Sequence, residues 1–136
     1  MFRRRLPPLN PKPSNLGIVI IDHGSVRAAA NDQLVRFVML YRREGRHAIV
    51  EPAHMELAEP SMQDAVDRCV EQGARHIVVA PYFLATGKHW DRDIPRLAAE
   101  AVARHAGVTH QVAMPIGLHP LMAKIIDERI DECRGS

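Results

Sequence analysis

Residues 77–95 read IVVAPYFLATGKHWDRDIP, and this stretch decides the expected fold. Its first four residues form a short apolar run rich in β-branched side chains, which is typical of a buried strand. After it, apolar residues recur at helical spacing from Leu97 to Val102. Residues 81–95 are therefore expected to link a strand to a helix in an α/β unit. Ligands of open α/β sheets bind at such loops, because the loops lie outside the carboxyl ends of the strands.

The same alternation of strand and helix recurs along the chain. Apolar runs predict strands at residues 16–21, 47–54, 76–80 and 109–114. Amphipathic patterns predict helices at 28–43, from Ser61 to Gly73, from about Asp93 to Gly107 with Pro95 in the first turn, and from His119 onward with Leu121, Met122, Ile125, Ile126 and Ile130 on one face. Pro52 favours an edge position for the second strand. This order predicts a small α/β fold with a four-stranded parallel sheet and helices on both faces.

Composition bounds the class of protein. A chain of 136 residues suits one domain, expected at 16–136, and the prolines and arginines of residues 1–15 predict a flexible tail. The net charge of +2 is too small to indicate a nucleic-acid partner, and no apolar run is long enough to span a membrane. Two distant cysteines form no disulfide framework or CxxC motif, so we expect the cytoplasm.

Three potential metal ligands follow successive strands. His23 follows the first strand, Glu56 the second and His89 the third. Because parallel strands bring their carboxyl ends to one edge, these side chains are expected to converge there. Two imidazoles and a carboxylate suit a divalent first-row metal with an open coordination position. His54 precedes Glu56 on an alternating strand, so it is expected to share its direction and to support the site.

Other chemistries have weaker support. Each of the three residues, taken alone, is as well explained as an ordinary loop or surface side chain. Ser25 beside His23 suggests a nucleophile, but no G-x-S-x-G motif occurs and no acid is placed to orient a base. No dinucleotide-binding or P-loop motif is present, so no nucleotide cofactor is expected.

Several motifs together resemble the short-form sirohydrochlorin chelatases, the small class II chelatases of the CbiX/SirB type. The motifs are Asp22-His23-Gly24-Ser25 with Asn31, Glu56-Leu57-Ala58-Glu59-Pro60-Ser61, Gly73-Ala74, Pro81-Tyr82-Phe83-Leu84, Gly87-Lys88-His89, Asp93-Ile94-Pro95 and Gly117-Leu118-His119-Pro120. The resemblance runs from Leu16 onward and preserves order and spacing. Val26 departs from it, since relatives often carry arginine there, and Arg27 next to it is a candidate for the same contact. His54 departs too, because an aromatic or apolar residue is common at that position.

The resemblance implies a chelatase-like, Rossmann-like half-domain that works as a homodimer. It implies insertion of a divalent metal into sirohydrochlorin without ATP, in cobalamin or sirohaem biosynthesis, with His23, Glu56 and His89 handling the metal. Co²⁺ is the first expectation, Fe²⁺ the second and Ni²⁺ a weaker alternative. No cysteine-rich tail of the kind that holds a cluster in some plant relatives is present, so no iron–sulfur cluster is expected.

Sirohydrochlorin carries many carboxylates, which cationic side chains at the predicted mouth would meet. The candidate substrate-binding residues are Arg27, Tyr82, Lys88, Trp90, Arg92 and His119. The alternative to an enzyme is a metal or tetrapyrrole carrier, and a hydrolase built on Ser25 and His23 is a weaker third reading. The sequence leaves open which metal is physiological and which residue accepts the pyrrole protons.

Overall fold

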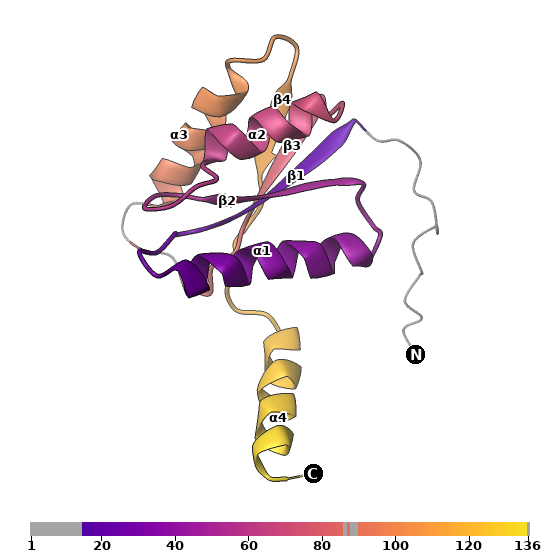
Figure 1. Ribbon diagram of the computed structural model, residues 1–136, viewed down its shortest axis with the longest axis vertical. Coiled ribbons are helices and arrows are strands. Elements are labelled where there is room, and N and C mark those ends of the chain that lie inside the picture. Colours follow the sequence, from indigo (N-terminus) through magenta and orange to yellow (C-terminus); the bar gives the residue numbers. More distant parts are fainter. Residues whose placement is uncertain (1–14, 86, 88–89, 136) are drawn as a thin grey trace.

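The computed structural model describes residues 15–85, 87 and 90–135, without the side chain of Trp90. The predicted tail, Lys88 and His89 thus lie outside the described residues, apart from Asn15. The elements in chain order are β1 (Leu16–Asp22), α1 (Ala28–Arg43), β2 (Ile49–His54), α2 (Met62–Glu71), β3 (His76–Pro81), α3 (Trp90–Val102), β4 (Thr109–Val112) and α4 (Leu121–Cys133). The four strands form one parallel sheet in the order β2-β1-β3-β4 (Figure 1), which confirms the predicted α/β fold.

One face of the sheet carries the larger core. Alternate residues of the central strands, Val19 and Ile21 in β1 and Ile77 and Val79 in β3, are fully buried on this face. They pack against the apolar sides of α2 and α3, with Ala65, Val66, Cys69, Ile94 and Ala98 in the same cluster. Both central strands are thus hydrophobic on both faces, as their sequences predict.

The opposite face, which we name the α1 face, carries a smaller core. Ile18 and Ile20 of β1 and Val50 of β2 pack there against Leu34 and Val38 of α1. Val78, Ala80 and Tyr82 adjoin this cluster and stay only half-buried. Helix α1 therefore covers the β1–β2 half of this face more completely than the β3–β4 half.

Helix α2 begins with a reciprocal cap. The Ser61 hydroxyl accepts from the Asp64 amide at 3.1 Å, and the Asp64 carboxylate accepts from the Ser61 amide at 2.9 Å. The helix lies so close to β1 that a Cβ on Gly17 would stand 2.9 Å from the Cβ atoms of Ala74 and Cys69. Burial raises the pKa of the Cys69 thiol to about 12, so this cysteine is inert, as expected.

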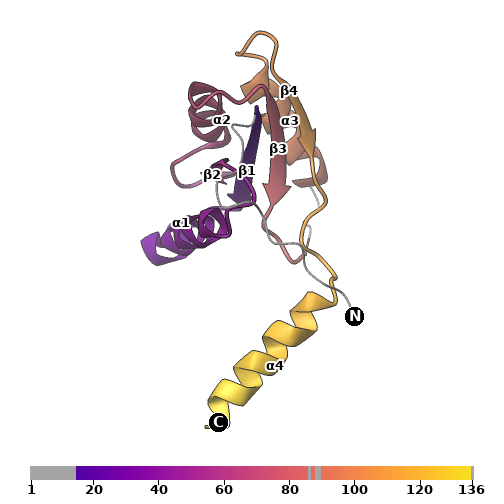
Figure 2. The ribbon, with the colours of Figure 1, turned by 90° about the vertical axis from the view of Figure 1, so that its right-hand side faces the viewer.

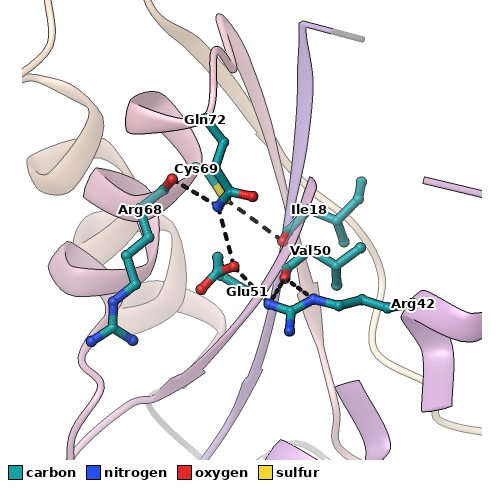
Figure 3. A network of polar contacts seen from close by, with 7 residues as sticks. All are labelled: Ile18, Arg42, Val50, Glu51, Arg68, Cys69 and Gln72. Carbon is teal, nitrogen blue, oxygen red and sulfur yellow. Dashed lines mark hydrogen bonds and ion pairs between the residues drawn. The ribbon is translucent and has the colours of Figure 1, made fainter. Parts of the chain in front are cut away.

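Strand β2 is an edge strand, as Pro52 predicted. Arg42 of α1 reaches across to this strand, donating to the Val50 carbonyl and pairing with the Glu51 carboxylate at 2.6 Å (Figure 3). Gln72 at the end of α2 donates to the same carboxylate at 3.2 Å. We name this arrangement of Arg42, Glu51 and Gln72 the β2 clamp.

The start of α3 and the end of β4 differ from the prediction. Helix α3 begins at Trp90 rather than near Asp93, so Pro95 lies inside the helix and not in its first turn. Asp91 and Asp93 occupy the first turn instead, where the helix dipole favours carboxylates. Strand β4 ends at Val112 rather than at Met114, and only its four residues pair with β3. It lies at the edge of the sheet, where Thr109 and Gln111 are exposed.

Helix α4 differs most from expectation. It extends away from the sheet (Figures 1 and 2) and buries none of its residues, so its apolar stripe lies on neither face. The predicted helices on both faces are confirmed, by α1 on one face and by α2 and α3 on the other, whereas α4 covers neither face. Among the described residues, no helix is long and apolar enough to cross a membrane.

Candidate functional site

Backbone hydrogen bonds join the loops after β1 and β2 at the carboxyl edge of the sheet. The register pairs Asp22 with His54, the last residues of these strands. Beyond them, the Met55 amide donates to the Asp22 carbonyl at 2.8 Å, and the Glu56 amide donates to the His23 carbonyl at 3.1 Å. The ladder thus continues past the strands and holds the backbones of two predicted metal ligands side by side.

Gly24 allows this close approach. Its φ is +84°, which L side chains rarely adopt, and a Cβ there would stand 1.8 Å from the Glu56 carbonyl oxygen. Any other residue at this position would force the loops of His23 and Glu56 apart. The glycine that the sequence places beside His23 is therefore required by contact as well as by conformation.

A buried Asp–His pair lies directly behind these loops. His54 is only 1% exposed, and its Nδ1 lies 2.6 Å from Asp22 Oδ1. The same Asp22 oxygen accepts from the Gly24 amide at 3.0 Å. Because a carboxylate only accepts, His54 Nδ1 is the donor in this contact. His54 Nε2 has no hydrogen-bond partner among the described residues.

This burial corrects one prediction. His54 and Glu56 were expected to point the same way, but His54 is buried whereas Glu56 is exposed. The reason is that β2 ends at His54, so the alternation of a strand does not extend to Glu56. His54 supports the site through Asp22 and the turn at Gly24.

His23 lies at the rim of a hollow between β1, α1 and the loop after β3. Its ring packs against Phe83, with centroids 4.2 Å apart and planes 32° from parallel. The hollow, of about 280 Å³, is lined by Asp22, His23, Gly24, Ser25, Ala30, Asn31, Gln33, Leu34, Tyr82 and Phe83. It places Tyr82, a predicted substrate-binding residue, beside the first predicted metal ligand.

Asn31 ties the loop after β1 to α1. Its side-chain oxygen accepts from the Ser25 amide at 2.9 Å, and its amide nitrogen donates to the Ser25 carbonyl at 2.7 Å. The Ser25 hydroxyl accepts from the Arg27 amide at 3.0 Å. Ser25 thus helps to shape the loop, which weakens the hydrolase reading of this serine.

The remaining predicted residues are placed less completely. Lys88 and His89 lie outside the described residues, and Trp90 is known only as the first residue of α3. Arg27 is exposed just before α1, and Arg92 is exposed in the first turn of α3.

His119 is exposed just before α4, where its Nδ1 accepts from the Leu121 amide at 3.1 Å. The loop before it is tied to the site, because the Gly117 amide donates to the Phe83 carbonyl at 3.1 Å. The structure therefore gives His119 a capping contact at the start of the helix, and its predicted contact with substrate stays a prediction.

The described residues contain two of the three predicted metal ligands. Within residues 15–85, 87 and 90–135, no group of three or more His, Cys, Asp or Glu side chains is arranged to hold a metal ion. The complete set of His23, Glu56 and His89 therefore stays a prediction.

Three supporting residues were assigned no clear role from the sequence alone. Phe83 belongs to a quoted motif, and it is both buried and stacked on His23. Asn31 belongs to a quoted motif. Its position six residues after Ser25 is the sequence signal for the two hydrogen bonds between its side chain and the Ser25 backbone. The pairing of Asp22 with His54 follows only from the strand register, which a single sequence does not determine.

Comparisons with known proteins point in one direction. The family model described as CbiX matches residues 17–133. The chain is 46% identical to the chloroplastic sirohydrochlorin ferrochelatase of Arabidopsis thaliana over 86% of its own length and 52% of that protein. It is 34% identical to the sirohydrochlorin cobaltochelatase of Methanopyrus kandleri, over 88% of this chain and 98% of that one.

A solved structure shares the fold. The sirohydrochlorin chelatase SirB from Bacillus subtilis subspecies spizizenii, in complex with cobalt, matches with a TM-score of 0.78 at 29% identity. The match covers 86% of this chain and 50% of SirB. This chain thus spans about half the length of both SirB and the plant relative. With the family model matched along nearly its whole length, the chain belongs to the CbiX family.

Proposed function

We propose that this protein is a sirohydrochlorin chelatase that inserts a divalent metal ion into sirohydrochlorin without ATP. The observation that supports it best is the ladder that joins the loops of His23 and Glu56 beside an open hollow. The CbiX family match and relatives named as ferrochelatases and cobaltochelatases support the same reaction.

Metal insertion requires a partly desolvated metal ion at the face of the ring and removal of two pyrrole protons. In our proposal, His23 and Glu56, with His89, hold the metal substrate weakly and leave one side open. An imidazole or the Glu56 carboxylate then accepts a pyrrole proton. Weak binding is needed because the metal must pass to the tetrapyrrole.

The physiological metal is proposed to be cobalt or iron. Relatives are named for both metals, and SirB structures were solved in complex with cobalt and with Fe³⁺. The imidazole and carboxylate ligands fit both metals and also nickel, because affinity order alone does not determine selectivity. The product would thus enter cobalamin or sirohaem biosynthesis.

The substrate's carboxylates are proposed to meet cations near the hollow. Arg27 follows the loop of His23 directly and is exposed, and Tyr82 lines the hollow itself. Lys88, Trp90, Arg92 and His119 complete the proposed set. We also propose a homodimer, because a sheet of four strands gives one chain only a small core that a second copy would extend, and a cytoplasmic location, which suits the exposed free thiol of Cys133.

An anaerobic absorbance assay tests the reaction. Sirohydrochlorin is mixed with the protein and Co²⁺, Fe²⁺ or Ni²⁺ in turn, using the wild type and the variants His23→Ala, Glu56→Gln and His89→Ala. We expect rapid insertion by the wild type and a large loss of rate in all three variants. Glu71→Gln, an exposed carboxylate on α2, is the matched control and should keep the wild-type rate.

Two results would contradict the proposal. If the wild type inserted no metal faster than the protein-free reaction, the protein would not be a chelatase. Tight metal binding without insertion would then favour a carrier. Full rates in His23→Ala and Glu56→Gln would remove the assigned ligands but leave the reaction in place.

A further inference from the structure

Each of the three loops that carry a predicted metal ligand also exposes one large aliphatic side chain. The exposed fractions of Val26, Leu57 and Leu84 are 85%, 65% and 63%. These residues lie in the loops after β1, β2 and β3, respectively, at the carboxyl edge of the sheet. Single exposed apolar side chains are ordinary on a protein surface, so exposure alone does not indicate a site. These three differ from ordinary exposed residues in the backbone that holds them.

Leu57 is held in a backbone conformation that costs free energy. Its φ is +69°, and among the described residues it is the only one other than glycine with a positive φ. A bulky side chain in this left-handed region crowds the neighbouring backbone, whereas glycine and asparagine adopt the conformation more readily. A loop that served only as a connection would therefore be more stable with glycine at this position. Outliers of this kind occur mainly at functional sites.

The chain reverses at Leu57 because the residue before it is fixed. The Glu56 amide donates to the His23 carbonyl at 3.1 Å, and the Glu56 carbonyl lies against Gly24. The loop then closes at the Pro60 carbonyl, which accepts from the last amide of β2 at 2.8 Å. These contacts explain the turn, but they do not explain a leucine, whose side chain is left largely in solvent.

The backbones beside the other two aliphatic residues are fixed as well. Asn31 holds both backbone groups of Ser25, the residue before Val26, at 2.9 and 2.7 Å. The carbonyl of Phe83, the residue before Leu84, accepts from the linker after β4 at 3.1 Å. Side chains on a fixed backbone lose less conformational freedom on binding, which favours affinity for a ligand.

We propose that Val26, Leu57 and Leu84 form a rim, which we name the aliphatic rim, against which the ring skeleton of sirohydrochlorin lies. The carboxylates of this substrate lie at the periphery of the ring, and the conjugated skeleton inside them is apolar. Cations meet the periphery, whereas the rim meets the skeleton, because aliphatic carbon offers a carboxylate no replacement for water. Arg27 follows Val26 directly and is exposed, so one loop offers both kinds of contact.

Leu57 is the member of the aliphatic rim that links the ring to the metal. It adjoins Glu56, a proposed metal ligand, so a ring that rests on Leu57 also meets the loop that carries this ligand. The cost of the left-handed conformation is then balanced by substrate binding rather than by folding. The inference rests on the proposed function, because it takes sirohydrochlorin as the ligand, and its test therefore measures binding without metal.

The experiment measures metal-free binding of sirohydrochlorin by anaerobic absorbance titration, together with urea denaturation of the free protein. Leu57→Asn removes the apolar side chain and tolerates the left-handed conformation. We expect about tenfold weaker binding, as for the partial burial of one leucine, while the urea midpoint stays equal or rises. Leu57→Met keeps an apolar side chain and should bind like the wild type. Leu40→Asn, the same change at an exposed leucine of α1, is the matched control and should also bind like the wild type.

The possible results separate the aliphatic rim from the proposed function. Equal binding by Leu57→Asn and the wild type would overturn the rim, as would binding by Leu57→Met that is as weak as that of Leu57→Asn. A lower urea midpoint for Leu57→Asn would assign the leucine to folding and would overturn the rim as well. A wild type that binds no sirohydrochlorin would refute the proposed function itself. Tight binding by the wild type without metal insertion would refute the reaction alone.

Discussion

At the scale of single residues, the site depends on side chains that fix the backbone around the metal ligands. Asp22 accepts from both the Gly24 amide and His54, so one carboxylate sets the turn that presents His23. Phe83 then fixes the imidazole ring of His23 by stacking. His23 and Glu56 are exposed, whereas the residues that orient them are buried or half-buried.

Gly24→Ala is expected to separate the loops of His23 and Glu56. The added Cβ would meet the Glu56 carbonyl oxygen at 1.8 Å, and the positive φ adds strain. We expect a loss of unfolding free energy of about 3 kcal/mol or more, together with loss of metal insertion. Urea denaturation and the absorbance assay measure the two effects.

Gly107→Ala is the matched control for this change. Gly107 also has a positive φ, of +79°, but a Cβ there would meet no atom within 4 Å. It should cost only the backbone strain, about 1–2 kcal/mol, and leave insertion intact. Equal effects of the two variants would show that the contact with Glu56 does not matter.

His54→Leu is expected to weaken metal binding while the protein stays folded. Leucine removes the hydrogen bond to Asp22, and a bond to a charged group contributes about 1.5 kcal/mol or more. We expect about tenfold weaker Co²⁺ binding, measured from the visible absorption of bound Co²⁺. His54→Asn places a donor near the position of Nδ1 and should restore most of the affinity, so equal binding by both variants would contradict this role.

The sequence predicts that the loops of His23 and Glu56 meet, but it does not predict the residues that hold them there. His23 and Glu56 were placed together because each follows a parallel strand, and strand order is readable from apolar runs. The burial of His54 was not readable, because it depends on where β2 ends. The pairing of Asp22 with His54 depends on a register between strands that are 32 residues apart in sequence.

At the scale of the elements, a hydrogen bond joins α2 to the turn that follows α3. His105 Nε2 lies 2.7 Å from the Asp67 carboxylate, which also accepts from Gln63 at 2.7 Å. Burial alone would raise the pKa of Asp67, but the hydrogen bonds from His105 and Gln63 and the nearby positive charges lower it below its usual value of 3.8.

This lowered pKa predicts an acid-dependent contribution to stability. A carboxyl group whose pKa is lower in the folded state stabilises fully above its unfolded pKa, and the contribution is lost as the pH falls through the folded pKa. Asp67→Asn should therefore be less stable than the wild type at pH 5, and the difference should shrink below about pH 4. Urea denaturation between pH 3 and pH 6 measures it.

Asp127→Asn, on the exposed surface of α4, should show no such pH-dependent difference. If the unfolding free energies of Asp67→Asn and the wild type differed by the same amount over this whole pH range, the Asp67 carboxylate would not be the source of the pH-dependent stability.

The pattern of the elements was readable, but two of their ends were not. Helix α3 starts three residues before Asp93, because Asp91 and Asp93 in its first turn stabilise that end while Pro95 is tolerated inside. Strand β4 stops early, because an edge position offers its polar residues no burial. The first boundary depends on the charges in the first helical turn and the second on burial at the edge of the sheet, and the spacing of apolar residues indicates neither.

At the scale of the whole molecule, the apolar stripe of α4 was predicted but its partner was not. A periodic pattern shows that a helix has one apolar side, and it does not show which surface that side meets. In the structure the stripe meets no strand or helix closely enough to bury any residue of α4.

The proposed homodimer makes thermal stability depend on protein concentration. Folding that is linked to association gains free energy by mass action, so the melting temperature should rise as protein concentration increases. Calorimetry over a hundredfold range of concentration measures this, and a constant melting temperature would contradict a dimer that forms on folding.

The β2 clamp makes the two edges of the sheet unequal with respect to aggregation. An exposed edge strand can recruit a strand from another molecule, and charged side chains at the edge prevent this. At β2, an incoming strand would have to displace Arg42 from the Val50 carbonyl and from Glu51. At the other edge, β4 offers a pairing length of only four residues. The protein is therefore protected against fibril growth by charge on one side and by shortness on the other, and loss of Arg42 would expose the longer edge.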